Sequence, residues 1–348
     1  MQLNKLKLFV RNFFSQIIFL LFPLRIISFF SYIFHDLEKK KREENREQFV
    51  KMSIFGNNFV MYLEKNSHQT PGYIETSKGT TIYEETMIFC LSSILRTMKK
   101  VVFFDIGSYI SYYGLYVSSF TKDKGAVYTI ESNPLYNEIS KKSKEHNGFK
   151  NFTNSNCILS DKSEEYLVHE LTVTRKKHLL DYKDKTIIYD HYEKKELNDI
   201  LEKGKPYTST TLDKFCLSNE VAPNVLKIDV HGSEGLIFRG ANKTLESSVE
   251  YILLEVHQQE LLDLFSDGIK RVDILDQLNQ KGFNNYIISP FRYNKKNFDY
   301  KQYKISKKLK YLKLDKNNYQ DVLFDRNQLD IFVLSIRSNL SIDDLDCF

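Results

Sequence analysis

The sequence predicts a doubly wound α/β fold, in which a mostly parallel sheet is covered by helices on both faces. From residue 101 onward, apolar segments of strand length alternate with amphipathic segments of helical periodicity. The strands are apolar throughout, as a sheet between two layers of helices requires. With 42% hydrophobic and 27% charged residues among 348, the chain can bury a large core, which excludes a disordered or disulfide-stapled protein.

The elements follow one another in a regular order. Strands are predicted at residues 101–106, 126–131, 152–159, 225–230, 251–256, 285–289 and 329–336. Helices are predicted at residues 84–97, 111–120, 134–146, 234–245 and 270–281. Because no helix separates the last two strands, we expect a seven-stranded sheet that ends in an antiparallel hairpin. Another hairpin, turning at Gly56-Asn57, precedes the first helix.

We expect three regions along the chain. Residues 1–48 hold apolar and basic helices followed by a charged linker, and residues 49–99 hold the hairpin and a helix that pack on the core. Residues 100–348 form the main α/β domain. Two polar inserts interrupt this domain, at residues 162–210 and 291–327.

The N-terminal segment, residues 1–35, is strongly apolar and carries four basic residues but no acidic one. Arg11, Pro23 and Arg25 interrupt it, and the uninterrupted run has about half of the ~20 apolar residues that cross a membrane. No small-residue cleavage site follows, which argues against a signal peptide. We therefore expect helices that lie in the membrane interface. The alternative is a pair of helices packed on the body of the same protein.

A second basic segment lies in the later insert, where residues 291–317 carry ten Lys or Arg and two Asp. The rest of the chain is acidic, so it would repel a nucleic-acid backbone, and no N-P-P-[YF] motif of nucleic-acid methylation appears. We expect no nucleic-acid partner and place this segment on an anionic membrane surface. The four cysteines form no C-x-x-C pair, which indicates reduced thiols and a cytosolic setting.

Polar residues follow the first two strands of the main domain. Ligands of open α/β sheets bind beyond the carboxyl ends of the strands, where Asp105, Gly107 and Ser108 lie. Gly107 allows a close backbone approach. Glu131 ends the second strand, where a carboxylate can accept hydrogen bonds from both ribose hydroxyls of an adenosine cofactor; the alternative is a solvated charge. Tyr109 departs from the G-x-G-x-x-G pattern of dinucleotide binding, so S-adenosylmethionine fits better than NAD.

A third group of polar residues follows the next two strands. Asp229, His231, Glu255 and His257 would reach one rim of the sheet, and either histidine could take a proton from an acceptor hydroxyl near neutral pH. Two alternatives remain open. These residues could hold a divalent metal, or Asp229 and Glu234 could merely cap the next helix. We favour the catalytic interpretation and expect no metal.

Several motifs occur together in the order of a known family. They are D-x-G at 105–107 near Tyr83-Glu84, E-x-N-P at 131–134, LSD at 159–161, TTLD at 210–213, KIDVxGxE at 227–234, GAxxTL at 240–245 and LLEVH at 253–257. Over residues 80–290 the chain resembles the FkbM-type S-adenosylmethionine-dependent methyltransferases. The resemblance implies a class I methyltransferase (Rossmann-like) fold and O-methylation of sugar or natural-product hydroxyls.

The same resemblance assigns roles to individual residues. It implies that Asp105, Gly107 and Glu131 bind the cofactor, and we add Ser108 to this set. It also places Ser160 and Asp161 near the adenine, and it places Asp229 and Glu234 on the acceptor side, where we add Glu255. The chain departs from the family pattern in having Tyr109 for an asparagine, Ser111 for a glycine and His231 for an acid.

We therefore expect an O-methyltransferase of polysaccharide biosynthesis at the cytoplasmic membrane face. Its acceptor would be a hydroxyl of a glycan, a lipid-linked saccharide or a related metabolite, with specificity shaped by the insert at 162–210. His231 or His257 would remove the hydroxyl proton with support from Asp229. Tyr109 and Ser111 motivate the alternative of a catalytically impaired binding or scaffold protein, and a nucleic-acid methyltransferase is a third hypothesis.

Overall fold

A computed structural model describes most of the chain. The described residues are 48–63, 70–79, 81–169, 172–176, 194–289, 304–306, 309–315, 318 and 330–345. The expected membrane-interface helices at 1–35 lie outside these residues, as does most of the basic segment at 291–317. Within the described part of the chain, every helix is too short or too polar to cross a bilayer.

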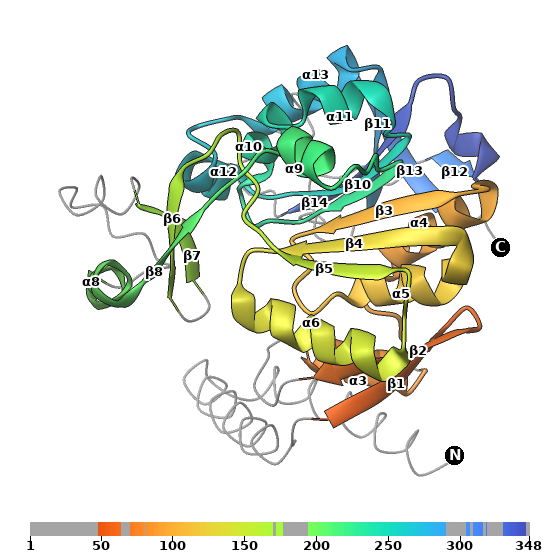
Figure 1. Cartoon of the computed structure of the whole chain (residues 1–348). Helices are drawn as coiled ribbons and strands as arrows, with labels where there is room; N and C mark the ends of the chain where they lie inside the picture. Colours follow the sequence, from red (N-terminus) through yellow and green to blue (C-terminus); the bar gives the residue numbers. More distant parts are fainter. Residues whose placement is uncertain are drawn as a thin grey trace, which may run out of the picture. The chain divides into compact units, whose positions relative to one another are not determined.

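One central sheet organises the main domain (Figure 1). Its strands run in the order β12-β13-β11-β14-β10-β9-β3-β4-β5. The seven predicted strands are β3 (Val101–Ile106), β4 (Gly125–Glu131), β5 (Phe152–Asn156), β9 (Val225–Ile228), β10 (Tyr251–Val256), β11 (Phe283–Ser289) and β14 (Ile331–Arg337). Strands β5, β4, β3, β9 and β10 are parallel, whereas β14 is antiparallel to both β10 and β11. The doubly wound sheet and its antiparallel end are confirmed.

The sheet has two strands more than the sequence predicted. Strands β12 (Lys304–Ser306) and β13 (Leu309–Leu314) come from the basic insert and extend the edge beside β11. The sequence of β13, LKYLKL, has its two lysines three positions apart and shows no regular alternation of apolar and polar residues. The seven-stranded prediction was therefore too small, because this insert lacks the period of two that indicates a strand.

Helices cover both faces of the sheet (Figure 1). On one face lie α4 (Glu85–Thr97), α5 (Tyr112–Thr121) and α6 (Pro134–Asn147), and on the other lie α10 (Glu234–Arg239), α11 (Asn242–Ser247) and α13 (Arg271–Gln280). The helix predicted at 234–245 is thus broken in two. A Cβ at Gly240 would lie 2.2 Å from the Ser160 carbonyl oxygen, so the break lies where the two backbones meet. Four of the described α-helices were not predicted: α3 (Thr70–Ser77), α8 (Lys194–Lys203), α9 (Leu212–Ser218) and α12 (Gln259–Phe265).

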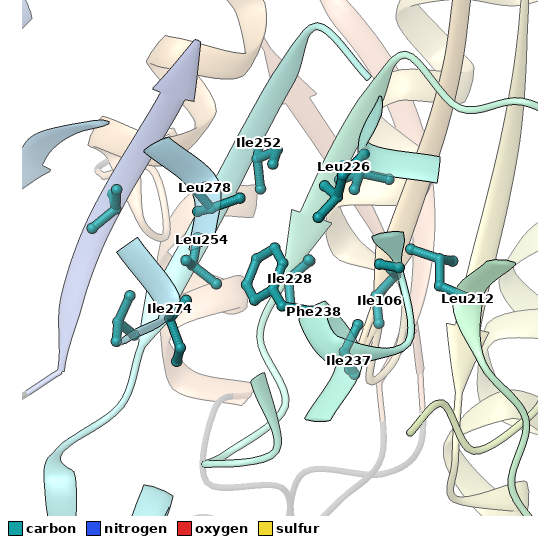
Figure 2. Close-up of a cluster of buried hydrophobic side chains, with 14 of the residues drawn as sticks. Ile106, Leu212, Leu226, Ile228, Ile237, Phe238, Ile252, Leu254, Ile274 and Leu278 are labelled. Atoms are coloured by element: carbon teal, nitrogen blue, oxygen red, sulfur yellow. The ribbon is translucent and has the colours of Figure 1, made fainter. Parts of the chain in front are cut away.

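The apolar core on the α10 and α13 face is continuous (Figure 2). It joins Leu226 and Ile228 of β9 and Ile252 and Leu254 of β10 to Ile237, Phe238, Ile274 and Leu278 of the helices. Each such side chain contributes about 1.5–3 kcal/mol when fully buried. Because side chains alternate along a strand, Lys227 of β9 and Glu255 of β10 face the α4 and α5 layer instead.

The N-terminal hairpin is bonded to the sheet's helical layer. Strands β1 (Gln48–Ile54) and β2 (Asn57–Leu63) flank a turn at Phe55-Gly56, where both residues have positive φ. The Val60 N–H donates to Asn147 Oδ1 on α6 at 2.8 Å, and the amide of Asn147 donates back to the Val60 carbonyl at 2.7 Å. The predicted hairpin is confirmed, and these bonds hold it against the end of α6.

The insert at 162–210 forms a small sheet of its own. Strands β6 (Glu165–His169), β7 (Thr172–Arg175) and β8 (Lys205–Thr208) pair antiparallel in the order β7-β6-β8. Helix α8 (Lys194–Lys203) precedes β8. Most residues between β7 and α8 lie outside the described part of the chain.

In the turn after β3, Gly107 lies closer to a neighbouring backbone than any other glycine of the chain does. Gly107 has φ +71°, and a Cβ there would lie 1.8 Å from the Asp229 carbonyl oxygen. Gly148 has a similar φ of +65° but open space around it. A left-handed conformation costs an L-residue about 1–2 kcal/mol, and a forced clash adds about 1–3 kcal/mol. We expect Gly107→Ala to lower the free energy of unfolding by about 3 kcal/mol or more.

The matched control is Gly148→Ala, for which we expect a loss of about 1–2 kcal/mol from backbone strain alone. Chemical denaturation of both variants measures the difference. Equal losses in the two variants would contradict the close approach of the two backbones.

Candidate functional site

The loop after β3 has left-handed backbone at three alternate residues. Positive φ occurs at Gly107, at Tyr109 (+49°) and at Ser111 (+65°). Tyrosine and serine disfavour this region, whereas asparagine and glycine tolerate it. The chain thus has the backbone that an Asn and a Gly would favour while carrying Tyr109 and Ser111. Such strain persists only where the surroundings hold it in place.

Hydrogen bonds explain how Ser111 is accommodated. Its buried hydroxyl donates to Ser108 Oγ at 3.3 Å and accepts from Ser140 of α6 at 2.5 Å. Asn154 of β5 donates to Ser140 at 2.6 Å. The Ser111 side chain therefore points into a buried polar chain beneath the turn. Ser108, a predicted cofactor residue, is buried and bonded within the same chain.

Tyr109 is held at both its backbone and its ring. Its N–H donates to Glu131 Oε2 at 2.7 Å, and its ring meets Tyr136 of α6 edge-on with centroids 4.3 Å apart. The ring is thus in contact with α6. The backbone bond links the loop after β3 directly to the carboxylate that ends β4.

Glu131 is the central acceptor of this half of the site. Besides Tyr109, it accepts hydrogen bonds from the Asn133 N–H at 2.8 Å and the Ser132 hydroxyl at 3.4 Å. Burial raises its pKa to about 7, although the two N–H donors act in the opposite direction. The carboxylate therefore loses its proton near neutral pH.

Asp105 lies on β3, facing α5. Its Oδ2 accepts the Gly114 N–H at 3.0 Å, and within the described part of the chain its buried Oδ1 has no hydrogen-bond partner. Burial raises the pKa of Asp105 to about 6, against the lowering effect of Lys227. Asp105 thus presents a buried acceptor that a hydrogen-bond donor of a ligand could satisfy.

Lys227 occupies the position beside Asp105 on the neighbouring strand β9. Its ammonium donates to Asp229 Oδ2 at 3.1 Å and lies 5.0 Å from the centre of the Tyr113 ring. Burial would lower its pKa, but Asp229 and Asp105 raise it overall. Burial would raise the pKa of Asp229, but Lys227 and the two histidines lower it. The two residues form a stable buried ion pair.

The two predicted histidines are in contact. His231 Nδ1 lies 3.1 Å from His257 Nε2, and His257 Nδ1 lies 2.7 Å from Glu234 Oε1. Asp229 Oδ1 lies 3.8 Å from His257 Nε2. The strand predicted at 225–230 ends earlier, at Ile228, and His231 lies in the following turn with φ +50°. The prediction that these side chains meet at one rim is confirmed.

The charge of this group is unevenly distributed. His257 is buried, and although burial alone would lower its pKa, Glu234 and Asp229 raise it to about 10. His231 is exposed at the surface, and its pKa is lowered by partial desolvation and by the positive charge of His257. The buried ring therefore carries the extra proton, and the outer ring stays neutral.

The structure places two expected acceptor residues below the surface. Glu234 is 0% exposed, and its Oε1 also accepts the Gly232 N–H at 3.1 Å. Glu255 is buried on β10. Direct contact of these carboxylates with an acceptor stays a prediction, whereas the contact of Glu234 with His257 is observed.

Ser160 and Asp161, expected near an adenine, are joined to the insert. Arg175 of β7, 3% exposed, pairs with Asp161 at 3.4 Å and with Asp267, which follows α12, at 2.7 Å. It also donates to the Tyr166 hydroxyl, which in turn bonds Ser160 Oγ at 3.2 Å. The small sheet is thereby tied to the segment after β5 and to the segment after α12.

Sequence reasoning missed Arg175 and the environment of Tyr113. The Tyr113 hydroxyl donates to Glu84 Oε2 at 2.5 Å, beside Lys227. The Tyr83-Glu84 pair was noted only as part of a motif, and Arg175 lies among many basic residues of the insert. No local pattern distinguished that arginine from its solvated neighbours.

The sheet order and the polar turn after β3 define a class I methyltransferase fold. The Methyltransferase FkbM domain matches residues 105–284, more than half of the chain. The chain therefore belongs to the FkbM family of S-adenosylmethionine-dependent methyltransferases. No curated relative matches the chain.

Solved structures show weaker similarity. Methyltransferase FkbM from Methylobacillus flagellatus is 15% identical with a TM-score of 0.30, and the match covers 45% of this chain and 33% of that one. An S-adenosylmethionine-dependent O-methyltransferase from Thermotoga maritima is 10% identical over 82% of this chain and 77% of that one, with a TM-score of 0.37. TYW2 from M. jannaschii, solved with AdoMet, is 11% identical over 84% and 88%, with a TM-score of 0.34.

The position of Arg175 leads to a stability prediction. Removing one partner of a buried ion pair costs about 3–5 kcal/mol because the remaining charges lose their partner. We expect Arg175→Met to lower the free energy of unfolding by about 3 kcal/mol in urea denaturation. Lys176→Met is the control. Lys176 pairs with Glu165 at 2.8 Å, and because both side chains are exposed, this pair should contribute less than about 1 kcal/mol to the free energy of unfolding. Similar losses for the two variants would show that Arg175 does not anchor the insert.

Proposed function

We propose that this chain is an S-adenosylmethionine-dependent O-methyltransferase. The observation that supports this most strongly is the meeting of two polar groups at the ends of adjacent strands. The loop after β3 and Glu131 form one group, and the His231–His257 pair forms the other. They are joined where Gly107 meets the backbone of Asp229.

The residues of the first group fit the expected cofactor. Glu131 lies where it can accept hydrogen bonds from ribose hydroxyls, and the unsatisfied Asp105 Oδ1 is an acceptor for a donor group such as an ammonium. The buried carboxylates also suit a positively charged sulfonium. When bound, S-adenosylmethionine supplies an electrophilic methyl group. Ser160 and Asp161 complete the proposed cofactor contacts.

The second group suits removal of a proton from the acceptor. His231 is exposed, so its Nε2 is the atom that can meet a hydroxyl. While His257 holds the extra proton, its Nδ1–H donates to Glu234 and its Nε2–H donates to His231 Nδ1. After the pair loses one proton and the bridging hydrogen moves to His231 Nδ1, His231 Nδ1–H donates to His257 Nε2. This tautomer leaves His231 Nε2 free of hydrogen and able to accept the hydroxyl proton. Asp229, near His257, stabilises the positive charge that follows.

We further propose that the acceptor is a hydroxyl of a glycan, a lipid-linked saccharide or a related metabolite. The small sheet of the insert, fixed by Arg175, would shape its binding. The apolar, basic segment 1–35 and the basic segment 291–317 support an anionic membrane surface as a partner and a cytoplasmic, peripheral location.

Cofactor binding gives a pH prediction. With a pKa of about 7, Glu131 is mostly protonated at pH 6 and mostly ionised at pH 8. Because the ionised form accepts the ribose hydroxyls, we expect S-adenosylhomocysteine to bind about tenfold more weakly at pH 6 than at pH 8. Isothermal titration of the full chain measures both constants. Glu131→Gln, the control, should bind weakly at both pH values.

The alternative of an impaired binding or scaffold protein rests on the strained Tyr109 and Ser111. It predicts no binding of S-adenosylhomocysteine to the natural chain at about 1 mM, and binding only after Tyr109→Asn and Ser111→Gly. That pair of results would contradict the proposed enzyme.

The acceptor side is tested by methyl transfer. The chain is incubated with S-adenosylmethionine carrying a tritiated methyl group and a panel of nucleotide sugars and polyprenyl-linked saccharides. We expect a base-stable methyl ether, and we expect His231→Ala to lower the rate about 100-fold or more, the usual contribution of a general base. His146→Ala, at an exposed position near the end of α6, should have little effect. Label in nucleic acid, or full activity of His231→Ala, would contradict this assignment.

A further inference from the structure

We propose that Asp229, His231 and His257 form a binding site for a divalent transition-metal cation. One ligand atom from each residue lies within 4.8 Å of the other two. The residues come from the ends of β9 and β10, so the sheet itself brings them together.

The spacing of the two imidazoles fits a shared ion. Nitrogen ligands lie about 2.0–2.1 Å from Zn²⁺ and similar ions, so two of them on one ion are about 3.0–3.4 Å apart. His231 Nδ1 and His257 Nε2 are 3.1 Å apart. An ion here takes the place of the hydrogen that bridges the two rings, and its binding releases a proton.

The carboxylate offers an oxygen that the protein leaves unused. Asp229 Oδ2 is held by the Lys227 ammonium at 3.1 Å. Asp229 Oδ1 is buried, lies 3.8 Å from His257 Nε2 and has no hydrogen-bond partner within the described part of the chain. A buried acceptor without a hydrogen bond, beside two imidazole nitrogens, is an atom that a cation could bind.

A second layer of contacts orients the ligands. His257 Nδ1 is 2.7 Å from Glu234 Oε1, the carboxylate–histidine contact found behind metal-bound imidazoles. Glu234 is fixed in turn by the Gly232 N–H at 3.1 Å. The buried Glu234 thereby acquires a positioning role.

Another trio, Glu255, His257 and Asp330, also brings its ligand atoms together. It contains one imidazole, and Asp330 Oδ1 already accepts the Gln258 N–H at 3.0 Å. Two imidazoles and one carboxylate form the set that binds transition metals with coordination positions left open. We therefore assign the site to the Asp229, His231 and His257 trio.

The site deepens the proposed function and rests on it for its role, though not for its existence. An ion with open positions attracts an acceptor hydroxyl and lowers its pKa. The ion would then take over the task that the proposed function gives to His231, whose ring would serve as a ligand. His231→Ala lowers activity in either case, so activity alone cannot distinguish the two roles.

Metal binding is therefore measured directly, with the full chain and without cofactor or acceptor. Co²⁺ is titrated at pH 8 and followed by its visible absorption, with Zn²⁺ as competitor. We expect one Co²⁺ per chain with a dissociation constant in the micromolar range or tighter, displaced by Zn²⁺. His231→Ala and His257→Ala should each weaken binding at least 100-fold. Glu234→Gln should weaken it about 10–100-fold, as outer contacts do.

The controls separate this site from other histidines and from misfolding. His169→Ala should bind Co²⁺ as the natural chain does. Zn²⁺ should raise the thermal midpoint of the natural chain but not that of His231→Ala, whose altered side chain is exposed. An absence of Co²⁺ binding by the natural chain, or equal binding by His231→Ala, would overturn the proposal. Binding of S-adenosylhomocysteine is titrated separately, so either proposal can fail alone.

Discussion

The contact between Gly107 and the Asp229 carbonyl is the constraint on which the site depends. Two backbones can approach this closely only where one residue lacks a side chain. The contact joins the end of β3 to the end of β9, and with them the proposed cofactor half and the proposed acceptor half of the site. Methyl transfer requires the reacting groups to be held close together and in line, so this junction sets the geometry of the proposed reaction.

Buried charge is the second organising feature. Three carboxylates lie at or near the ends of the neighbouring strands β4, β3 and β9: Glu131, Asp105 and Asp229. The ammonium of Lys227 compensates only part of their negative charge. Desolvation raises the pKa of the first two, while the ammonium keeps Asp229 ionised. A site of this kind is suited to positive ligands, whether a sulfonium, a proton on an imidazole or a metal ion.

Much of the fold could be predicted from the sequence because its signals are local. Apolar strands such as 101–106 and 251–256 were predicted with their observed ends, since period and length are properties of neighbouring residues. The strand at 309–314 was missed because its lysines resembled a solvated loop. The break at Gly240 was missed because its cause is the Ser160 carbonyl, which is distant in sequence.

The candidate site was predicted in part for the same reason. Strand order places Asp229, His231 and His257 together, and these contacts are observed. The burial of Glu234 beneath His257 could not be predicted, because it depends on how α10 begins. The hydrogen bonding of Ser111 could not be predicted either, because its hydroxyl accepts from Ser140 on α6, 29 positions away. Tyr109 and Ser111 have positive φ angles that asparagine and glycine tolerate better, and these angles are visible only in the structure.

The central claim is that an adenosyl cofactor binds between the ends of β3 and β4. A crystal structure of the chain with S-adenosylhomocysteine tests it most directly. The account predicts ribose hydroxyls within hydrogen-bond distance of Glu131 and the Tyr109 ring still against Tyr136. An empty crystal structure at saturating ligand, with the Tyr109 ring filling the space beside Glu131, would contradict it.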